Sequence, residues 1–192
     1  MFRRMTRERY LSDDELARLM SAVRERRHVH QPRDYALFAL LANTGLRPSE
    51  ARALTRADCH LAGRWPWVEL HRVGKKHGPQ PLRRLFLQRQ VADIVSRYLI
   101  LIPGDTQARL FDFTKRQGAR LFHYYASKAG IPSTLKIYSL RHTVGMRLWA
   151  HTKDIRLVQG ILGHTNLQAT ECYFHTSPET IREAYEAAGT AT

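Results

Sequence analysis

Residues near the C-terminal end of the sequence have types and spacing that suit the binding of a phosphate group. If residues 138–149 form a helix, Leu140, Val144 and Leu148 fall four positions apart on one side, the spacing of a buried stripe. The other side then carries Tyr138, Arg141, His142 and Gly145. Glycine costs about 1 kcal/mol relative to alanine inside a helix, so its presence on that side indicates a close approach. An arginine, a histidine and a missing side chain on one face predict a phosphate site.

Three further residues lie where the local sequence suits chemistry. His164 follows a glycine and precedes Tyr173 by nine positions. Arg47, in TGLRPSE, lies at a rigid joint, because Gly45 suits a helix end and Pro48 a helix start. That joint favours a fixed arginine, and the alternative is a surface arginine beside a turn.

The sequence GKKHG, residues 74–78, suits the tip of a β-hairpin. Lys75 at such a tip can swing toward a bound chain, with Lys76 as the second choice. The alternative is a solvated run of charge, which exposed lysines often form.

The composition favours a polyanionic partner. The chain has 192 residues with 31 Lys+Arg against 17 Asp+Glu, giving a net charge of +14, the usual excess of a nucleic-acid binder. The alternative is a basic protein without such a partner. Two distant cysteines, Cys59 and Cys172, argue against a disulfide framework. With no apolar run of membrane-spanning length, we expect a cytoplasmic, nucleoid-associated protein.

The periodicity predicts a mainly α fold with a small antiparallel β-sheet (α+β). The expected helices cover 12–26, 33–43, 49–54, 88–101, 114–129, 138–149 and 154–161, followed by a helix that Asn166 caps and that carries Tyr173, and a last helix from Ser177. The expected strands cover 67–73 and 81–87. Phe122, Tyr124 and Tyr125 are expected in the core.

In this order and spacing, Arg47, Lys75, Arg141, His164 and Tyr173 resemble the catalytic domain of the tyrosine recombinase (phage integrase) family. The resemblance covers residues 10–176. It implies the integrase catalytic-domain fold and site-specific cutting and rejoining of DNA, without ATP or metal.

The resemblance also implies a role for each of these residues. Tyr173 is the expected nucleophile, which forms a 3′-phosphotyrosyl link and frees a 5′-hydroxyl. Arg47 and Arg141 are expected to hold the non-bridging phosphate oxygens, and His164 to bind or position the phosphate. Lys75 is the expected general acid for the leaving 5′-oxygen.

One position departs from the family pattern. The family usually has histidine where this chain has Tyr138, and a phenol is no neutral-pH base. Which group deprotonates Tyr173 is therefore open, and His142, next to Arg141, is a candidate.

The layout resembles that of short members without an N-terminal clamping domain, such as the fimbrial phase-switch recombinases, and equally that of a piece of a longer protein or a gene remnant. We expect a basic arm at 1–11, a catalytic domain at 12–176, and a C-terminal helix and tail at 177–192 that packs on its own domain in the free protein and on a neighbouring protomer on DNA. The implied partners are double-stranded DNA with inverted-repeat sites, further copies of the chain in a tetramer on DNA, and accessory DNA-bending proteins.

Other classes stay open. One is an enzyme like the type IB topoisomerases, and another is a DNA-binding protein that has lost strand transfer. A metal site at His164, Cys172 and His175 matches no standard zinc spacing.

Overall fold

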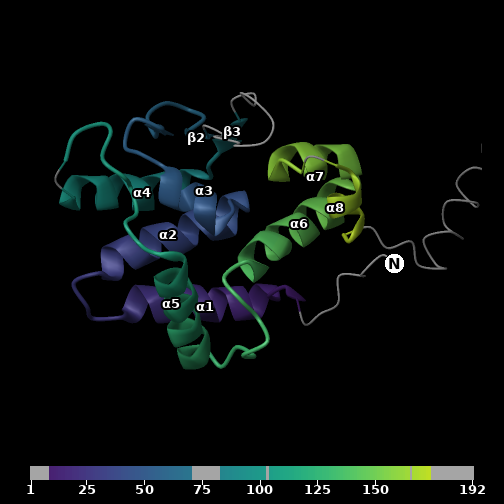
Figure 1. Cartoon of the computed structure of the whole chain (residues 1–192), viewed down its shortest axis with the longest axis horizontal. Coiled ribbons are helices and arrows are strands. Elements are labelled where there is room, and N and C mark those ends of the chain that lie inside the picture. Colours follow the sequence, from purple (N-terminus) through teal and green to yellow (C-terminus); the bar gives the residue numbers. More distant parts are fainter. Residues whose placement is uncertain (1–8, 71–82, 103, 165, 174–192) are drawn as a thin grey trace, which may run out of the picture.

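The structure is a computed structural model that describes residues 9–70, 83–102, 104–164 and 166–173 (Figure 1). Its helices are α1 (Asp13–Glu25), α2 (Gln31–Thr44), α3 (Pro48–Ala53), α4 (Arg89–Leu101), α5 (Lys115–Lys128), α6 (Ser139–Thr152), α7 (Ile155–Leu162) and α8 (Gln168–Glu171). Its strands are β1 (Cys59–His60), β2 (Trp67–Leu70) and β3 (Arg83–Phe86). The α+β prediction is confirmed.

Local signals set most helix ends where the sequence predicts them. Ser12 caps α1 in a capping box, in which its hydroxyl accepts from the Glu15 N–H at 3.1 Å and the Glu15 carboxylate accepts from the Ser12 N–H at 2.8 Å. Thr114 begins α5 in the same way. Gly45 ends α2 in the left-handed region at φ 66°, and Pro48 is the first residue of α3.

The sheet is antiparallel in the order β1-β2-β3, with Val68 opposite Leu85 and Leu70 opposite Arg83. Because side chains alternate across a strand, these four share one face of the sheet. Val68, Leu70 and Leu85 on that face are buried, so Arg83 is an arginine on the inner face. Strand β1 is only two residues long and has no sequence signal of its own.

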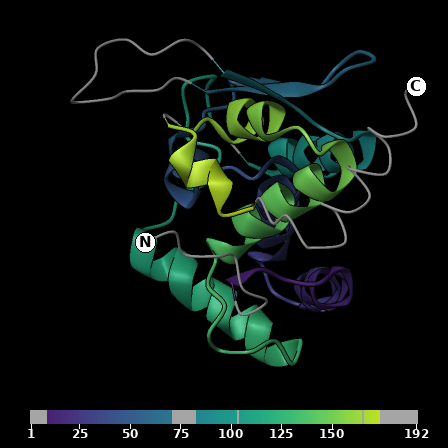
Figure 2. The same ribbon diagram turned by 90° about the vertical axis from the view of Figure 1, so that its right-hand side faces the viewer.

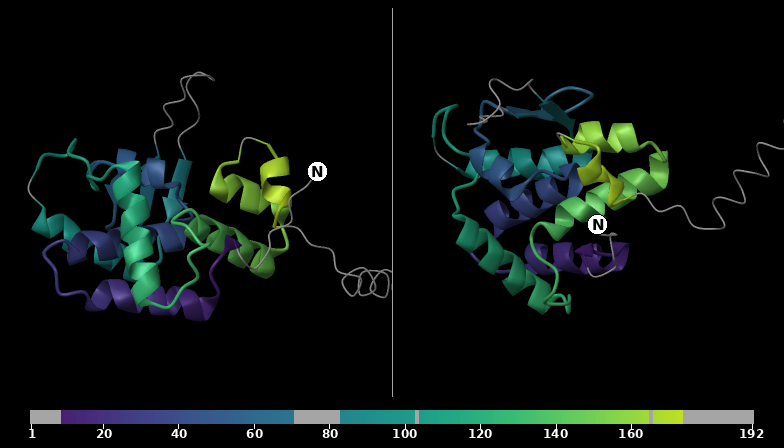
Figure 3. Two further views of the ribbon diagram at one scale, coloured as in Figure 1. Left: turned by 60° about the horizontal axis from the view of Figure 1, so that its bottom comes forward. Right: turned by 45° about the vertical axis from the view of Figure 1, so that its right-hand side comes forward.

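Helix α2 is the centre of the fold, packed against α1, α3, α4 and α6 (Figure 1). The sheet lies at one end of the molecule, and α8 lies beside α6 and α7 in the turned views (Figures 2 and 3). The large core extends from α1 to the start of α6. A second, smaller core joins Val144 of α6, Val158 and Leu162 of α7, and Tyr173.

Two predictions about these elements are wrong. Helix α8 ends at Glu171, so Tyr173 follows it instead of lying within it. Tyr124 is 44% exposed and lies under the guanidinium of Arg26, 4.6 Å from its ring centroid, whereas Phe122 and Tyr125 are buried as expected.

Several predictions fall outside the described residues. They are the hairpin tip with Lys75 and Lys76, His175, and the helix from Ser177. Within the described residues, no helix combines the length and apolar character that a bilayer span requires.

Candidate active site

Arg141 lies on the first turn of α6 and is almost fully buried, with 1% of its surface exposed. Its guanidinium donates to the Gly45 carbonyl at 2.7 Å and to the Leu162 carbonyl at 2.6 Å. Its Nε is buried and has no acceptor among the described residues. Arg141 therefore ties the end of α2 to the end of α7 and keeps one buried donor for a further acceptor.

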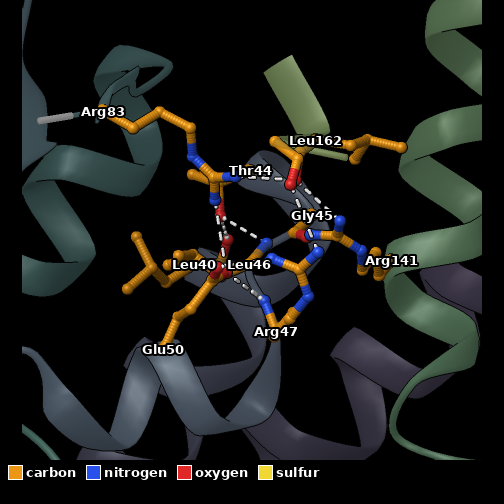
Figure 4. Close-up of polar contacts among 10 residues, drawn as sticks. Leu40, Thr44, Gly45, Leu46, Arg47, Glu50, Arg83, Arg141 and Leu162 are labelled. Carbon is orange, nitrogen blue, oxygen red and sulfur yellow. Dashed lines mark hydrogen bonds and ion pairs between the residues drawn. The ribbon is translucent and has the colours of Figure 1, made fainter. Parts of the chain in front are cut away.

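Arg47 reaches the same turn from the joint before α3. Its guanidinium donates to the Gly163 carbonyl at 3.3 Å and pairs with the Glu50 carboxylate at 2.7 Å. Its backbone N–H donates to the other Glu50 oxygen at 2.8 Å. The joint thus holds Arg47 in place, as the fixed-arginine reading predicts, and Figure 4 shows Arg47 and Arg141 converging beside Leu162.

Arg83, which the sequence analysis does not select, completes this group. From the inner face of β3 it donates to the Leu162 carbonyl at 2.6 Å and pairs with Glu50 at 3.2 Å (Figure 4). We call Arg47, Glu50, Arg83 and Arg141 the arginine cluster. A sequence signal did exist, because Arg83 alternates with Leu85 and Leu87 as an inward-facing position should.

Gly163 has two reasons to be glycine. Its φ of 64° lies in the left-handed region that side chains disfavour. A Cβ at this position would also overlap the Arg83 guanidinium. The turn that ends α7 can therefore lie against the arginine cluster only because residue 163 has no side chain.

Tyr173 lies beside this turn, with 1% of its surface exposed. Its ring is parallel to that of His164, with 6.3 Å between centroids and 7° between planes. Its hydroxyl lies 3.0 Å from Nδ1 of His142. His164 in turn contacts Thr170 of α8 through a 2.7 Å hydrogen bond.

The fold thus gathers Arg47, Arg141, His142, His164 and Tyr173, residues separated by as many as 126 positions in the chain (47 to 173). Tyr138 lies at the N-terminal end of α6, 39% exposed, with its ring edge-on to His142 at 5.1 Å. No hydrogen bond between Tyr138 and Tyr173 is present among the described residues. Lys75 and Lys76 fall outside the described range.

Burial and the nearby arginines shift the pKa values of the two histidines and the tyrosine in this site. Burial, then the charges of Arg9 and Arg141, lower the pKa of His142 to about 4. Burial, then Arg141 and Arg47, lower the pKa of His164 to about 4. Burial raises the pKa of Tyr173 well above its ordinary value, although Arg141 opposes that change. At neutral pH both imidazoles are therefore neutral and the phenol is protonated.

Glu50 balances the positive charge of the cluster. Its burial favours the neutral acid, but Arg83 and Arg47 outweigh this effect and hold the pKa of the carboxyl below its ordinary value. Burial and Arg47 lower the pKa of Arg141. The cluster holds three guanidiniums against one carboxylate, a net positive site that suits an anion.

Gly145 accommodates a tyrosine ring, which corrects the phosphate interpretation of this position. An ideal Cβ on Gly145 would lie 2.5 Å from Cζ of Tyr173 and 2.7 Å from Cε1. The close approach to Gly145 that the sequence predicts is present, but the group that approaches is the Tyr173 side chain and not a phosphate. The glycine is therefore a packing requirement for the position of that tyrosine.

Under the nucleophile role that the family resemblance implies for Tyr173, Gly145→Ala is expected to displace the Tyr173 ring and slow covalent attachment to DNA by about 10²-fold, the cost of a misplaced reacting group. Gly160→Ala on α7 is the matched control, since no atom lies within 4 Å of its added methyl. The yield of the covalent adduct on a DNA substrate measures the loss of attachment. Thermal unfolding verifies that both variants are folded. Equal adduct rates in the two variants would contradict this account.

Glu50→Gln is expected to reduce the free energy of unfolding by about 2 kcal/mol, because Glu50 bridges two partly buried arginines and its loss leaves their charges uncompensated. Glu69→Gln is the control, since Glu69 pairs at 3.7 Å with Arg84, which is 61% exposed, and exposed pairs are worth about 0–1 kcal/mol. Urea unfolding of both variants measures the difference. Similar losses would show that the cluster is not a buried ion-pair network.

Acid is expected to destabilise the fold between pH 6.5 and about 4. His142 and His164 have a folded-state pKa of about 4 against an ordinary 6.5, so the unfolded chain binds more protons in that window. Their contribution to the free energy of unfolding is complete above pH 6.5 and is lost as the pH falls toward 4. Each histidine contributes at most about 3 kcal/mol. Urea titrations across this range should show a shallower pH slope for His142→Gln and His164→Gln, and an unchanged slope for the exposed His151→Gln.

Comparison with known proteins identifies the family and the fold. A family model described as the phage integrase family matches residues 9–180. Tyrosine recombinase XerC of Actinobacillus pleuropneumoniae serotype 7 (strain AP76) is 31% identical over 174 residues, covering 83% of this chain and 53% of that protein. XerC of Rhodospirillum centenum (strain ATCC 51521 / SW) is 32% identical over 164 residues, covering 81% and 46%. The chain spans about half the length of these curated relatives.

Solved structures share the fold. The XerH site-specific recombinase bound to difH substrate in a pre-cleavage complex superposes with a TM-score of 0.81 at 21% identity, covering 96% of this chain and 55% of that chain. The catalytic domain of bacteriophage HP1 integrase superposes with a TM-score of 0.63 at 19% identity, covering 92% and 93%. Because the family match spans most of its sequence, the chain belongs to the phage integrase family and has the fold of a tyrosine recombinase catalytic domain.

Proposed function

We propose that this chain is the catalytic part of a site-specific DNA recombinase that cuts and rejoins DNA through a covalent 3′-phosphotyrosyl intermediate. One observation carries the proposal. Arg47 and Arg141 both bind the turn 162–163, and the next residue, His164, stacks on the ring of Tyr173. Two guanidiniums, a neutral imidazole and a phenol at one turn suit a phosphodiester.

The arginines are proposed to hold the phosphate. In-line displacement gathers charge on the equatorial phosphate oxygens, and fixed guanidiniums are suitable donors for that charge. The buried Nε of Arg141 is a donor for this purpose. His164 is proposed to donate a hydrogen bond to the phosphate or to position it, while Tyr173 attacks phosphorus.

Lys75 is proposed as the general acid that protonates the leaving 5′-oxygen, with Lys76 as the second choice. A positioned acid of this kind contributes about 10²–10⁴ in rate. The tyrosyl ester conserves the energy of the broken bond, so we propose that neither ATP nor a metal ion is required.

Tyr173 must move for this reaction. With 1% of its surface exposed, its hydroxyl is enclosed by α6, α7 and α8 in the free protein. DNA binding is therefore proposed to shift the short segment around α8, while the Tyr173 hydroxyl stays within hydrogen-bond reach of Nδ1 of His142. That movement uncovers the hydroxyl next to the arginine cluster.

The proposed partners follow from charge and from the relatives. The net charge of +14 suits double-stranded DNA. Solved neighbours include XerH bound to difH substrate and the Tn1549 transposon integrase in complex with circular intermediate DNA. For this chain we propose inverted-repeat DNA sites, a homo-tetramer on DNA, docking of residues 177–192 on a neighbouring protomer, DNA-bending accessory proteins, and a location at the nucleoid.

The test is capture of a covalent DNA adduct. The protein is incubated with a library of nicked duplexes of random core sequence, and SDS-stable adducts are recovered and sequenced. We expect an enriched inverted repeat, adducts that persist in EDTA, and a DNA remnant that mass spectrometry locates on Tyr173. No adduct on any sequence, or attachment to another residue, would reject the proposal.

A second test separates the recombinase from a nicking-closing enzyme. Plasmids with paired copies of the recovered site are expected to give recombinants. Relaxation of supercoils without recombinants would favour the topoisomerase-like alternative. Specific binding without any adduct would favour a DNA-binding protein without strand transfer, the alternative that Tyr138 motivates.

A further inference from the structure

The hydroxyl of Tyr173 has a polar contact that plays no part in the roles proposed for the arginines, His164 and Lys75. It lies 3.0 Å from Nδ1 of His142, a hydrogen-bond distance between groups 31 residues apart. His142 follows Arg141 on α6. The Tyr173 ring packs against Gly145, one turn further on. Helix α6 thus holds an arginine for the phosphate, a histidine for the hydroxyl and a gap for the ring.

The surroundings of His142 keep its imidazole unprotonated at neutral pH. The rings of Tyr138 and Tyr173 contact the imidazole of His142. The charges of Arg9 and Arg141 act on its titration, and the charge of His142 acts on the titration of His164. The imidazole is neutral at pH 7 because burial and the two cations lower its pKa to about 4. A bound phosphate anion would offset the field of those cations, and so favour proton uptake when substrate is present.

Tyr138 is poorly suited to the same task. It occupies the position where the family resemblance leads us to expect histidine, but its phenol is not a base at neutral pH. Its ring packs edge-on against His142 with centroids 5.1 Å apart. This contact places Tyr138 against the imidazole, and no hydrogen bond joins Tyr138 to Tyr173 among the described residues.

We propose that His142 is the general base that deprotonates Tyr173. The Oη–H bond breaks as an Nδ1–H bond forms, and Oη bonds to phosphorus as the bond from phosphorus to the 5′-oxygen breaks. The leaving oxygen takes its proton from the general acid. In rejoining, the 5′-hydroxyl attacks phosphorus and returns its proton to the deprotonated general acid, while the bond from phosphorus to Oη breaks and the imidazolium returns its proton to Oη. This inference rests on the proposed function.

The experiment compares two leaving groups on a suicide substrate of the recovered site, one with a normal 5′-oxygen and one with a 5′-bridging sulfur. Sulfur leaves without protonation, so it rescues the loss of an acid but not the loss of a base. His142→Ala is expected to slow adduct formation by about 10²–10⁴ on both substrates. Lys75→Ala is expected to be slow on oxygen and fast on sulfur.

Further variants separate proton transfer from positioning. His142→Gln keeps a hydrogen-bond acceptor but no base, so it is expected to be as slow as His142→Ala, with a rate that rises about tenfold per pH unit as hydroxide takes over. Tyr138→Phe is expected to lose at least tenfold less activity than His142→Ala. His151→Ala, at the exposed end of α6, is the control for a histidine lost from this helix, and thermal unfolding verifies that each variant is folded.

The outcomes distinguish this inference from the proposed function. If wild type forms the Tyr173 adduct and folded His142→Ala reacts within threefold of it, the inference fails alone. Rescue of His142→Ala by the sulfur substrate would make His142 an acid and overturn it too. If wild type forms no adduct, the proposed function itself fails.

Discussion

Tyr173→Phe is expected to abolish covalent attachment to DNA while leaving the fold intact. The change removes only the hydroxyl, whose one hydrogen bond is worth about 1 kcal/mol. The ring keeps its place against Gly145 and parallel to His164. Without a nucleophile no phosphotyrosyl bond can form, so the adduct should vanish from denaturing gels while DNA binding persists in gel-shift assays.

A matched control is available in another buried tyrosine. Tyr125 is also fully buried, and its hydroxyl donates to Asp34 at 2.7 Å, away from the arginine cluster. Tyr125→Phe should lower the unfolding temperature and keep adduct formation. An adduct that survives in Tyr173→Phe would assign the nucleophile to another residue.

Arg141→Lys is expected to reduce the rate of DNA cleavage by about 10³-fold or more. The loss of one donor that stabilises charge in the transition state typically costs about 10²–10³ in rate. Here the variant loses both the phosphate contact and the support of the turn. The guanidinium spans the Gly45 and Leu162 carbonyls, which lie on different helix ends. A lysine keeps the charge but not the planar fork, so it cannot bind both carbonyls and a phosphate. Adduct formation measures the catalytic loss.

The same variant should lower stability by about 3 kcal/mol, the order expected for breaking a buried polar network. Arg147→Lys on the same helix is the control, since Arg147 is 46% exposed where it pairs with Asp13. It should change neither property measurably. Cleavage by Arg141→Lys at near wild-type rate would remove this residue from the site.

Local sequence was enough to determine most elements and to indicate the family. Caps such as Ser12 and Thr114, and helix ends such as Gly45, act within a few residues, so helices α1 to α7 lie close to their predicted ranges. The motifs around Arg47, Arg141, His164 and Tyr173 were enough to indicate the family, and the family match agrees.

Tertiary packing decided what the site residues contact. Arg83 joins the cluster because β3 turns its inner face toward α7, and Gly145 faces Tyr173 because α8 folds back onto α6. The contact between His142 and Tyr173 joins residues 31 positions apart. Short-range propensity carries no information about such contacts, because they depend on how whole helices pack against one another.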